Sequence, residues 1–261
     1  MKKTIFSGMA TAIVTPMTRD GIDFDALGRF IDFQIESGIN AIVVMGTTGE
    51  NATIEYADQK EIIRYTVERV NHRVPVIAGT GTNNTEHVIS NTKAACEVGA
   101  DAVLVVTPYY NKSTDIGILR HYHAIADAAK SPLILYNVPS RTGVSIAPET
   151  YAELSRHPNI YGVKEASGDL KAIQRTRNLC PEDFCIWMFD EQTKMEIVDD
   201  VFGKFYEKFG FYPESTSSYF LDAFTINYIK EKYPSVKCAV ATCWEEGPKA
   251  FHTCNNSWYT F

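Results

Sequence analysis

Residues 160–168 read Ile-Tyr-Gly-Val-Lys-Glu-Ala-Ser-Gly and indicate a buried strand that carries one lysine, Lys164. Strands of a parallel sheet covered on both faces are near-continuous apolar runs. An ammonium group there must be paired, reach the open end of the strand or lose its proton. A lysine with a lowered pKa keeps a free amine near neutral pH, and such an amine attacks ketones to form a Schiff base. The alternative is a strand-end lysine whose charge lies in water.

The chain around this strand alternates apolar strands with segments of helical period. After the first strand, for example, Leu27, Phe30, Ile31 and Ile35 recur at the spacing of one helix face. Such repeats imply a parallel sheet with right-handed crossovers, and their number favours an α/β fold of the closed (β/α)8 TIM-barrel type over an open sheet. The seven expected strands are residues 10–15, 41–45, 74–78, 102–107, 133–137, 160–166 and 184–187.

Composition narrows the classes of partner. The 261 residues carry a net charge of -7, which argues against nucleic-acid binding, because that needs basic surface. No apolar run approaches the roughly 18 residues of a membrane helix, and the N-terminus does not resemble a signal peptide, so we expect a cytoplasmic protein. A zinc site formed by Cys238, Cys243, His252 and Cys254 is conceivable, but their spacing fits no common pattern. We expect reduced thiols, no metal and no cofactor.

Residues able to do chemistry follow the expected strands. Residues 46–50 (Gly-Thr-Thr-Gly-Glu) offer two hydroxyls and backbone N–H groups for a carboxylate. Residues 108–111 (Pro-Tyr-Tyr-Asn) and 136–143 (Tyr-Asn-Val-Pro-Ser-Arg-Thr-Gly) add tyrosines and Arg141. A tyrosine with Thr48 could relay protons, and an arginine fork suits a carboxylate. Each segment alone could equally be a turn, a core aromatic or a solvated charge. Together they predict an active site at the carboxyl ends of the strands.

These segments, with residues 162–168, resemble in order and spacing the pyruvate-dependent class I aldolases of the dihydrodipicolinate synthase and N-acetylneuraminate lyase group. The synthase branch is the closer match, because the lyase branch acts on sugar acids and usually lacks an arginine at the position of Arg141. The resemblance covers residues 1–187.

The resemblance implies that Lys164 forms the Schiff base with pyruvate and that Tyr136 protonates and deprotonates the adduct. Thr48 would link Tyr136 to Tyr110 in a proton relay. The implied catalytic set is Lys164, Tyr136, Thr48 and Tyr110, and the implied substrate-binding set is Thr47, Thr48, Arg141 and Gly81.

The resemblance also implies a reaction and an assembly. Pyruvate would condense with L-aspartate 4-semialdehyde, whose carboxylate Arg141 would hold, in lysine and diaminopimelate biosynthesis. Because Tyr110 typically enters a neighbouring subunit's site in this family, a homo-oligomer, either a dimer or a tetramer, is implied. We expect weak or absent inhibition by lysine, because His87, Tyr56 and Gln59 replace residues typical of feedback-sensitive members.

Residues 188–261 depart from the family and are rich in aromatic residues. They suggest a second segment with a helix at 194–209 and strands at 215–220 and 236–242. Sequence order favours 215–220 as the strand that closes the barrel between 184–187 and 10–15, with 236–242 packed outside it. The chain also looks cut short at its apolar end. Three interpretations stay open: a working synthase completed by an unusual tail, a related aldolase acting on a sugar acid, and an inactive fused or truncated product.

Overall fold

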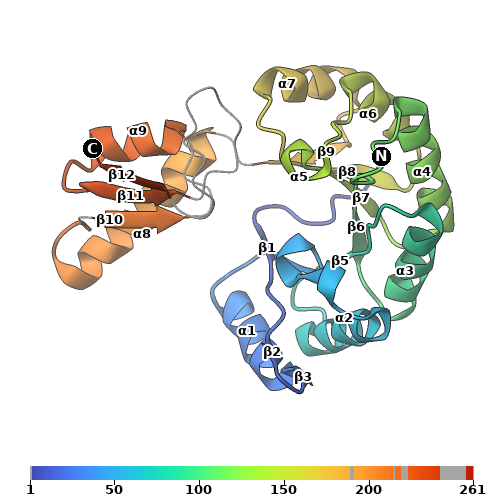
Figure 1. Ribbon diagram of the computed structural model, residues 1–261, viewed down its shortest axis with the longest axis horizontal. Coiled ribbons are helices and arrows are strands. Elements are labelled where there is room, and N and C mark those ends of the chain that lie inside the picture. Colours follow the sequence, from blue (N-terminus) through green and yellow to red (C-terminus); the bar gives the residue numbers. More distant parts are fainter. Residues whose placement is uncertain (1, 189–190, 214, 219–222, 242–256, 261) are drawn as a thin grey trace. The chain divides into compact units, whose positions relative to one another are not determined.

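The computed structural model describes residues 2–188, 191–213, 215–218, 223–241 and 257–260. The chain divides into two compact units, Met1–Trp187 and Met188–Phe261, each with its own sheet (Figure 1).

The first unit is built on a seven-stranded parallel sheet in which neighbouring strands follow sequence order. The sheet curls, and the helices lie along its outer side (Figure 1). All seven expected strands are confirmed, several of them one to three residues shorter than expected. They are β1 (Ala10–Ala12), β4 (Ala41–Val44), β5 (Val76–Gly79), β6 (Ala102–Val106), β7 (Leu133–Asn137), β8 (Ile160–Glu165) and β9 (Cys185–Trp187).

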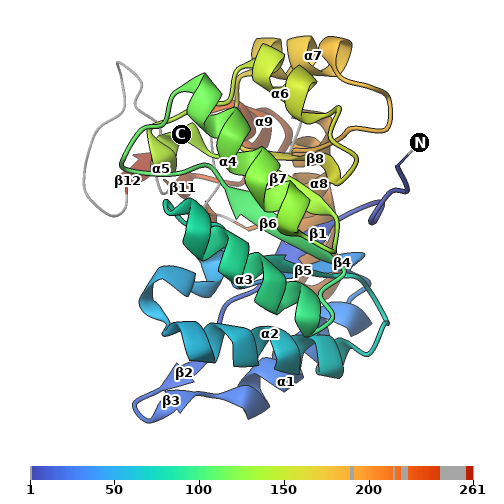
Figure 2. The same ribbon diagram turned by 90° about the vertical axis from the view of Figure 1, so that its right-hand side faces the viewer.

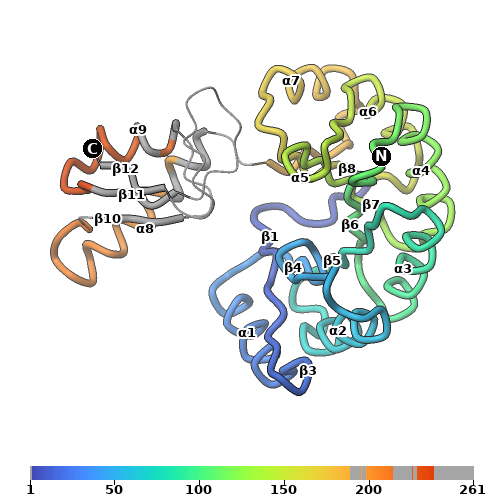
Figure 3. Tube along the Cα trace, viewed as in Figure 1, coloured from blue at the N-terminus to red at the C-terminus, as the bar shows by residue number. Residues whose placement is uncertain are grey.

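Helices connect consecutive strands, as the β-α alternation predicts, and the path can be followed in the Cα trace (Figure 3). Helices α2, α3 and α4 lie side by side (Figure 2). The helical segments are α1 (Phe24–Glu36), η1 (Thr47–Gly49), η2 (Asn51–Thr53), α2 (Tyr56–Val70), α3 (Thr85–Glu97), α4 (Asp115–Ala128), α5 (Pro139–Thr142), α6 (Pro148–Leu154) and α7 (Leu170–Leu179). The sequence analysis missed a small hairpin of β2 (Met17–Thr18) and β3 (Gly21–Ile22).

Side-chain caps fix where several of these helices begin. Asp23, Asn84, Thr114 and Asp169 each accept a hydrogen bond from a backbone N–H group in the first turn of α1, α3, α4 and α7, respectively. Such a cap satisfies one of the N–H groups that have no partner within the helix. The caps therefore fix the residue at which each of these loops ends and its helix begins.

Alternation along the strands separates two apolar faces. On the outer face Val44, Val105 and Leu135 pack with helix residues into the larger core. On the inner face of the curl Ile77, Ile134 and other side chains form a second cluster, extended by Phe6 and Trp187. The Phe6 and Trp187 rings stack with centroids 5.2 Å apart. A residue's position in the strand thus decides which face it serves.

The second unit holds α8 (Glu191–Phe209), β10 (Ser215–Ser218), α9 (Ala223–Lys232), β11 (Cys238–Ala241) and β12 (Ser257–Thr260). Its sheet has the order β10-β11-β12, with β10 parallel and β12 antiparallel to β11. Phe202, Ile229, Tyr233 and Val236 form its core. Asp199 ties α8 to α9 by accepting hydrogen bonds from Tyr228, Lys232 and Tyr233.

The expectation that 215–220 completes the first sheet while 236–242 packs elsewhere is wrong for the described residues, because Ser215–Ser218 pairs with Cys238–Ala241. The physical reason is composition. The apolar strand β11 takes the central position of the small sheet, and the serine-rich β10 takes an edge. Sequence order favoured the other arrangement, but it takes no account of the preference of apolar strands for the centre of a sheet.

We predict that Gly162→Ala destabilises the first unit. A Cβ atom at Gly162 would lie 2.2 Å from the backbone oxygen of Cys185 in β9, so the two strands would have to separate, at a cost of about 1–3 kcal/mol. Denaturant unfolding measures the change. The control is Gly203→Ala in α8, where the added Cβ meets no atom within 4 Å and the substitution favours the helix. Equal stability of the two variants would contradict the prediction.

Candidate active site

A cavity lies where the carboxyl ends of β4, β5, β6 and β7 meet. Because the strands are parallel, loops that are distant in sequence converge at this edge of the sheet. The lining residues are Met45, Gly46, Thr47, Asn51, Gly79, Gly81, Leu104, Val106 and Tyr136. Two of the expected substrate-binding residues, Thr47 and Gly81, therefore share a cavity with the expected catalytic residue Tyr136.

Two glycines allow the strands to come this close. A Cβ atom at Gly79 would lie 2.1 Å from the backbone oxygen of Met45, and one at Gly81 would lie 2.5 Å from the backbone nitrogen of Val106. Both contacts are with backbone, which cannot move aside without shifting a strand. The sequence analysis included Gly81 and missed Gly79, although an isolated glycine at the end of a strand is a signal of close backbone approach.

Lys164 and Tyr136 form the centre of the site. They are paired residues in the register of β8 with β7, and both belong to the inner face. Lys164 Nζ lies 4.6 Å from the centroid of the Tyr136 ring. The pKa of Lys164 is lowered from its ordinary value, first by burial and then by the positive charge of Arg141. A larger fraction of neutral amine is therefore present at a given pH, and the amine is the nucleophilic form.

The pKa of Tyr136 is shifted in the opposite direction, upward from its ordinary value. Its side chain is only 8% exposed, and burial raises the pKa of the phenol, an effect that Arg141 partly offsets. The phenol is therefore protonated at neutral pH and can act as a proton donor. Imine formation requires a neutral amine and a proton donor, and burial shifts the pKa values of Lys164 and Tyr136 toward these two forms.

Arg141 lies on the single helical turn α5, close enough for its charge to act on both groups. Pro139 starts this turn, and Gly143 ends it in the left-handed region, at φ 70°. Both residues suit these positions, since proline fits the first helical residue and glycine adopts positive φ without strain. The side chain of Arg141 is exposed, so the guanidinium stands at the mouth of the site rather than in the core.

Thr48 and Tyr110 are not brought to the centre. Thr47 and Thr48 are both exposed residues of η1, but only Thr47 lines the cavity. Tyr110 is 90% exposed and has a positive φ of 71°. Within the described residues no hydrogen bond joins Thr48 to Tyr136 or to Tyr110. One chain therefore brings Tyr136 to the cavity together with Thr47 and places Lys164, which is not among the residues lining that cavity, beside Tyr136. It leaves Thr48 and Tyr110 in solvent.

The sequence analysis missed a buried polar network behind the site. Glu165 follows Lys164 in β8, is 8% exposed, and accepts hydrogen bonds from the Asn137 Nδ2 group at 3.0 and 3.2 Å. The Tyr151 hydroxyl donates to the same carboxylate at 2.7 Å, and the Ser167 backbone N–H at 2.9 Å. A glutamate in an apolar strand was the available signal, because a buried carboxylate needs such partners.

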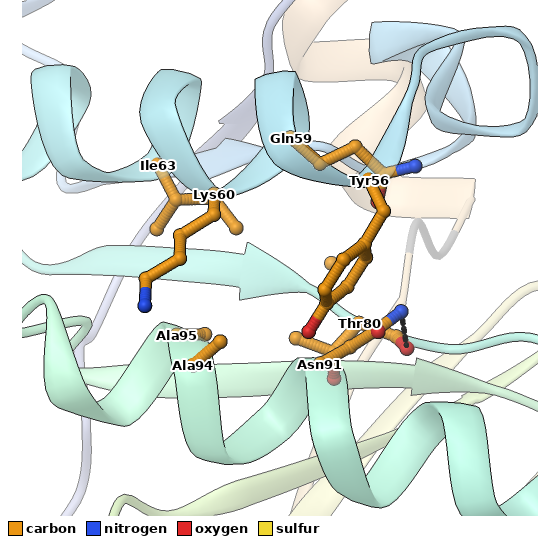
Figure 4. A pocket seen from close by; sticks show the side chains of 9 residues that line it. Tyr56, Gln59, Lys60, Ile63, Thr80, Asn91, Ala94 and Ala95 are labelled. Carbon is orange, nitrogen blue, oxygen red and sulfur yellow. Dashed lines mark hydrogen bonds between the residues drawn. The ribbon is translucent and has the colours of Figure 1, made fainter.

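A further pocket lies on the helix side of the sheet, between α2 and α3 (Figure 4). Tyr56 and Gln59, two positions of the expected feedback region, line it. The Gln59 Nε2 group donates to the backbone oxygens of Asn51 and Ile54, each at 2.8 Å. This amide is thus engaged in holding the η2 turn.

In the described part of the chain, no group of three or more His, Cys, Asp or Glu residues could hold a metal ion, and no helix is long and apolar enough to cross a membrane. Of the conceivable zinc ligands, Cys243, His252 and Cys254 lie outside the described residues.

The sequence matches the Dihydrodipicolinate synthetase family over residues 5–199. It is 48% identical to the 4-hydroxy-tetrahydrodipicolinate synthase of Acetivibrio thermocellus over 187 residues, which are 72% of this chain and 63% of that protein. The corresponding protein of Geobacter metallireducens is 49% identical over 187 residues, which cover 72% of this chain and 64% of the relative. The chain thus spans less than two thirds of the length of these relatives.

Solved structures agree with the sequence comparisons. Dihydrodipicolinate synthase from Aquifex aeolicus superimposes with a TM-score of 0.69 at 37% identity, over 72% of this chain and 66% of that one. The chloride-inhibited enzyme from Acinetobacter baumannii, complexed with pyruvate, gives a TM-score of 0.70 at 44% identity, over 74% of this chain and 67% of that one. The α/β barrel type of fold expected from the sequence is confirmed.

We predict that Lys164 titrates below the ordinary lysine pKa of 10.5 and that Arg141→Ala raises its pKa. Removing a nearby positive charge favours the ammonium form, so the shift is upward. The pH dependence of competitive acetylation at Lys164, followed by mass spectrometry, measures it. The control is Arg175→Ala, which removes an exposed arginine paired with Glu149. An unchanged or lowered Lys164 pKa in Arg141→Ala would refute the assignment of Arg141.

Proposed function

We propose that this chain, which belongs to the dihydrodipicolinate synthetase family, is a 4-hydroxy-tetrahydrodipicolinate synthase that condenses pyruvate with L-aspartate 4-semialdehyde. The observation that carries the proposal is the pair formed by Lys164 and Tyr136, with an amine of lowered pKa beside a protonated phenol. We place the reaction in the cytoplasm, in lysine and diaminopimelate biosynthesis. It needs no metal or cofactor.

The two groups suffice for the first chemical step. The lone pair of Lys164 Nζ forms a C–N bond to the C2 carbonyl of pyruvate, and the carbonyl oxygen takes up a proton. That proton comes from the nitrogen, and a second proton, from the Tyr136 phenol, lets the oxygen leave as water and gives the protonated imine. In this proposal Tyr136 is left as a phenolate, which accepts a proton in the next step.

The second step forms the carbon–carbon bond. Loss of a proton from the methyl carbon of the imine gives an enamine, and that carbon attacks the aldehyde carbon of the semialdehyde. The aldehyde oxygen becomes a hydroxyl. Hydrolysis or internal displacement by the product's amino group then returns Lys164 as a free amine. Arg141, exposed at the mouth of the site, would hold the carboxylate of the second substrate through a bidentate contact.

We further propose that Thr47 and Thr48 seat the pyruvate carboxylate and that a homo-oligomer, a dimer or tetramer, completes the proton relay. Tyr110 supports this part of the proposal, because its ring is 90% exposed and is therefore available to a second copy of the chain. A second copy would bury it. In this proposal Tyr110 of the neighbouring copy offers its hydroxyl to Thr48, and the contact between Thr48 and Tyr136 forms in the assembly.

The second candidate is an inactive synthase-like protein. In the described residues the first sheet has seven strands, and β10, β11 and β12 form a separate sheet. An inactive synthase-like protein is favoured if the seven-stranded sheet cannot support the site. A lyase acting on a sugar acid is less well supported, because the lyase branch usually lacks an arginine at the position of Arg141.

We predict that borohydride reduction in the presence of pyruvate adds the mass of a reduced pyruvate adduct to the peptide carrying Lys164. The reason is that the imine is reducible whereas the free amine is not. Peptide mass spectrometry locates the adduct. Lys164→Ala must show none. A folded, unaltered chain without an adduct at Lys164 would sink the synthase proposal and leave the inactive one.

We predict that Arg141→Ala weakens the use of L-aspartate 4-semialdehyde by about 2–4 kcal/mol of transition-state stabilisation, the range for losing one partner of a charged pair. The final yield of the pyruvate adduct should not change. Steady-state kinetics with each substrate and borohydride trapping measure the two effects. Arg141→Lys keeps the positive charge but loses the bidentate guanidinium group. Its use of L-aspartate 4-semialdehyde should therefore lie between that of the unaltered chain and that of Arg141→Ala. An equal loss of the adduct would instead give Arg141 a structural role.

A further inference from the structure

Glu165 occupies an unusual place for a carboxylate. It follows Lys164 in β8 and pairs in register with Asn137, just as Lys164 pairs with Tyr136. Strand alternation turns Glu165 to the outer face, between the sheet and the helices, where the neighbouring strand positions are Leu135 and Val163. Each member of the reacting pair on the inner face is therefore covalently adjacent to one member of a polar pair on the outer face.

The carboxylate is held from three segments around the site. The Asn137 amide at the end of β7 donates to both oxygens, and Tyr151 of α6 donates to one of them. The backbone N–H of Ser167, in the loop after β8, donates to the other. Asn137 is in turn held by the backbone N–H of Ile146, which donates to its Oδ1 atom at 3.2 Å. All of these partners of Glu165 are uncharged.

Packing alone does not account for such an arrangement. An apolar side chain would fill an outer-face strand position without desolvating a charge, and burying a carboxylate among neutral donors is unfavourable unless the hydrogen bonds are well placed. The carboxylate adds directional hydrogen bonds. Hydrogen bonds to three segments fix the ends of β7 and β8 relative to one another, which van der Waals contacts do less strictly.

We propose that Glu165 is a positioning residue that acts through Asn137 and Tyr151. Its hydrogen bonds hold the ends of β7 and β8 so that Lys164 Nζ and the Tyr136 hydroxyl keep the geometry for proton transfer during imine formation. The inference rests on the proposed function and deepens it. It assigns no contact between Glu165 and the substrate.

The test exchanges the donor and the acceptor between the two strands. Glu165→Gln keeps the size of the side chain but places one N–H2 group opposite another, that of Asn137. Asn137→Asp alone places two carboxylates together. The double variant Glu165→Gln with Asn137→Asp restores a donor facing an acceptor with the same net charge as the unaltered chain, so it should recover activity that each single change loses.

Three quantities are measured on the full chain: kcat, KM for pyruvate and the rate of borohydride trapping at Lys164. We expect Glu165→Gln to lower kcat and the trapping rate by about tenfold to a hundredfold, the effect of a small misplacement of reacting groups. KM for pyruvate should change by less than about threefold, because binding is not the function lost. The double variant should regain most of the lost kcat. Glu153→Gln, which removes an exposed carboxylate of α6 paired with Arg156, is the control and should match the unaltered chain.

Several outcomes overturn the proposal. It fails if folded Glu165→Gln keeps its kcat and trapping rate, if only KM rises, or if the folded double variant recovers nothing. Should Glu165→Gln not fold, as judged by circular dichroism, Tyr151→Phe decides, because it removes one donor and leaves the carboxylate. A lower kcat with unchanged KM then supports the proposal, and an unchanged kcat refutes it.

The same data separate this proposal from the function it rests on. If the unaltered chain traps no pyruvate, the synthase proposal fails and the positioning role falls with it. If all variants trap pyruvate at one rate, only the positioning role is refuted.

Discussion

The pairing of β7 with β8 is the constraint on which the site depends. Its register places Tyr136 beside Lys164 on one face and Asn137 beside Glu165 on the other. A slip of one residue would move every side chain to the opposite face, so the hydrophobic pattern of both strands holds the register. The same alternation that builds the core therefore sets the distance between the two reacting groups.

Burial shifts the pKa of each reacting group toward its neutral form. Desolvation disfavours charge, so it lowers the pKa of the Lys164 amine and raises that of the Tyr136 phenol. One physical effect thus produces a nucleophile and a proton donor from neighbouring positions. Arg141 acts on both groups in the same direction, lowering both pKa values, and so it favours the neutral amine while it limits the shift of the phenol.

The sequence predicts the first unit well because its information is local. The periods of strands and helices are each decided within a few residues, and β7 is found with its observed bounds. Lys164 was recognised because a lysine conflicts with an apolar strand. Gly79 was missed because its role depends on the approach of Met45 from another strand. The predicted strand pairing of the tail was wrong for the same reason. Distant segments compete for each pairing position, and local sequence does not show which of them wins.

Alternation also explains why a glutamate can follow the reactive lysine without silencing it. A carboxylate on the same face as an ammonium group would stabilise its charge and raise its pKa, which would hold the amine protonated. Glu165 lies on the opposite face, where Asn137 and Tyr151 satisfy it, and the pKa of Lys164 is set by burial and Arg141 instead. The sheet thus separates Glu165, which aligns the strands, from Lys164, which reacts. A salt bridge between them would have stabilised both side chains at the expense of the nucleophile.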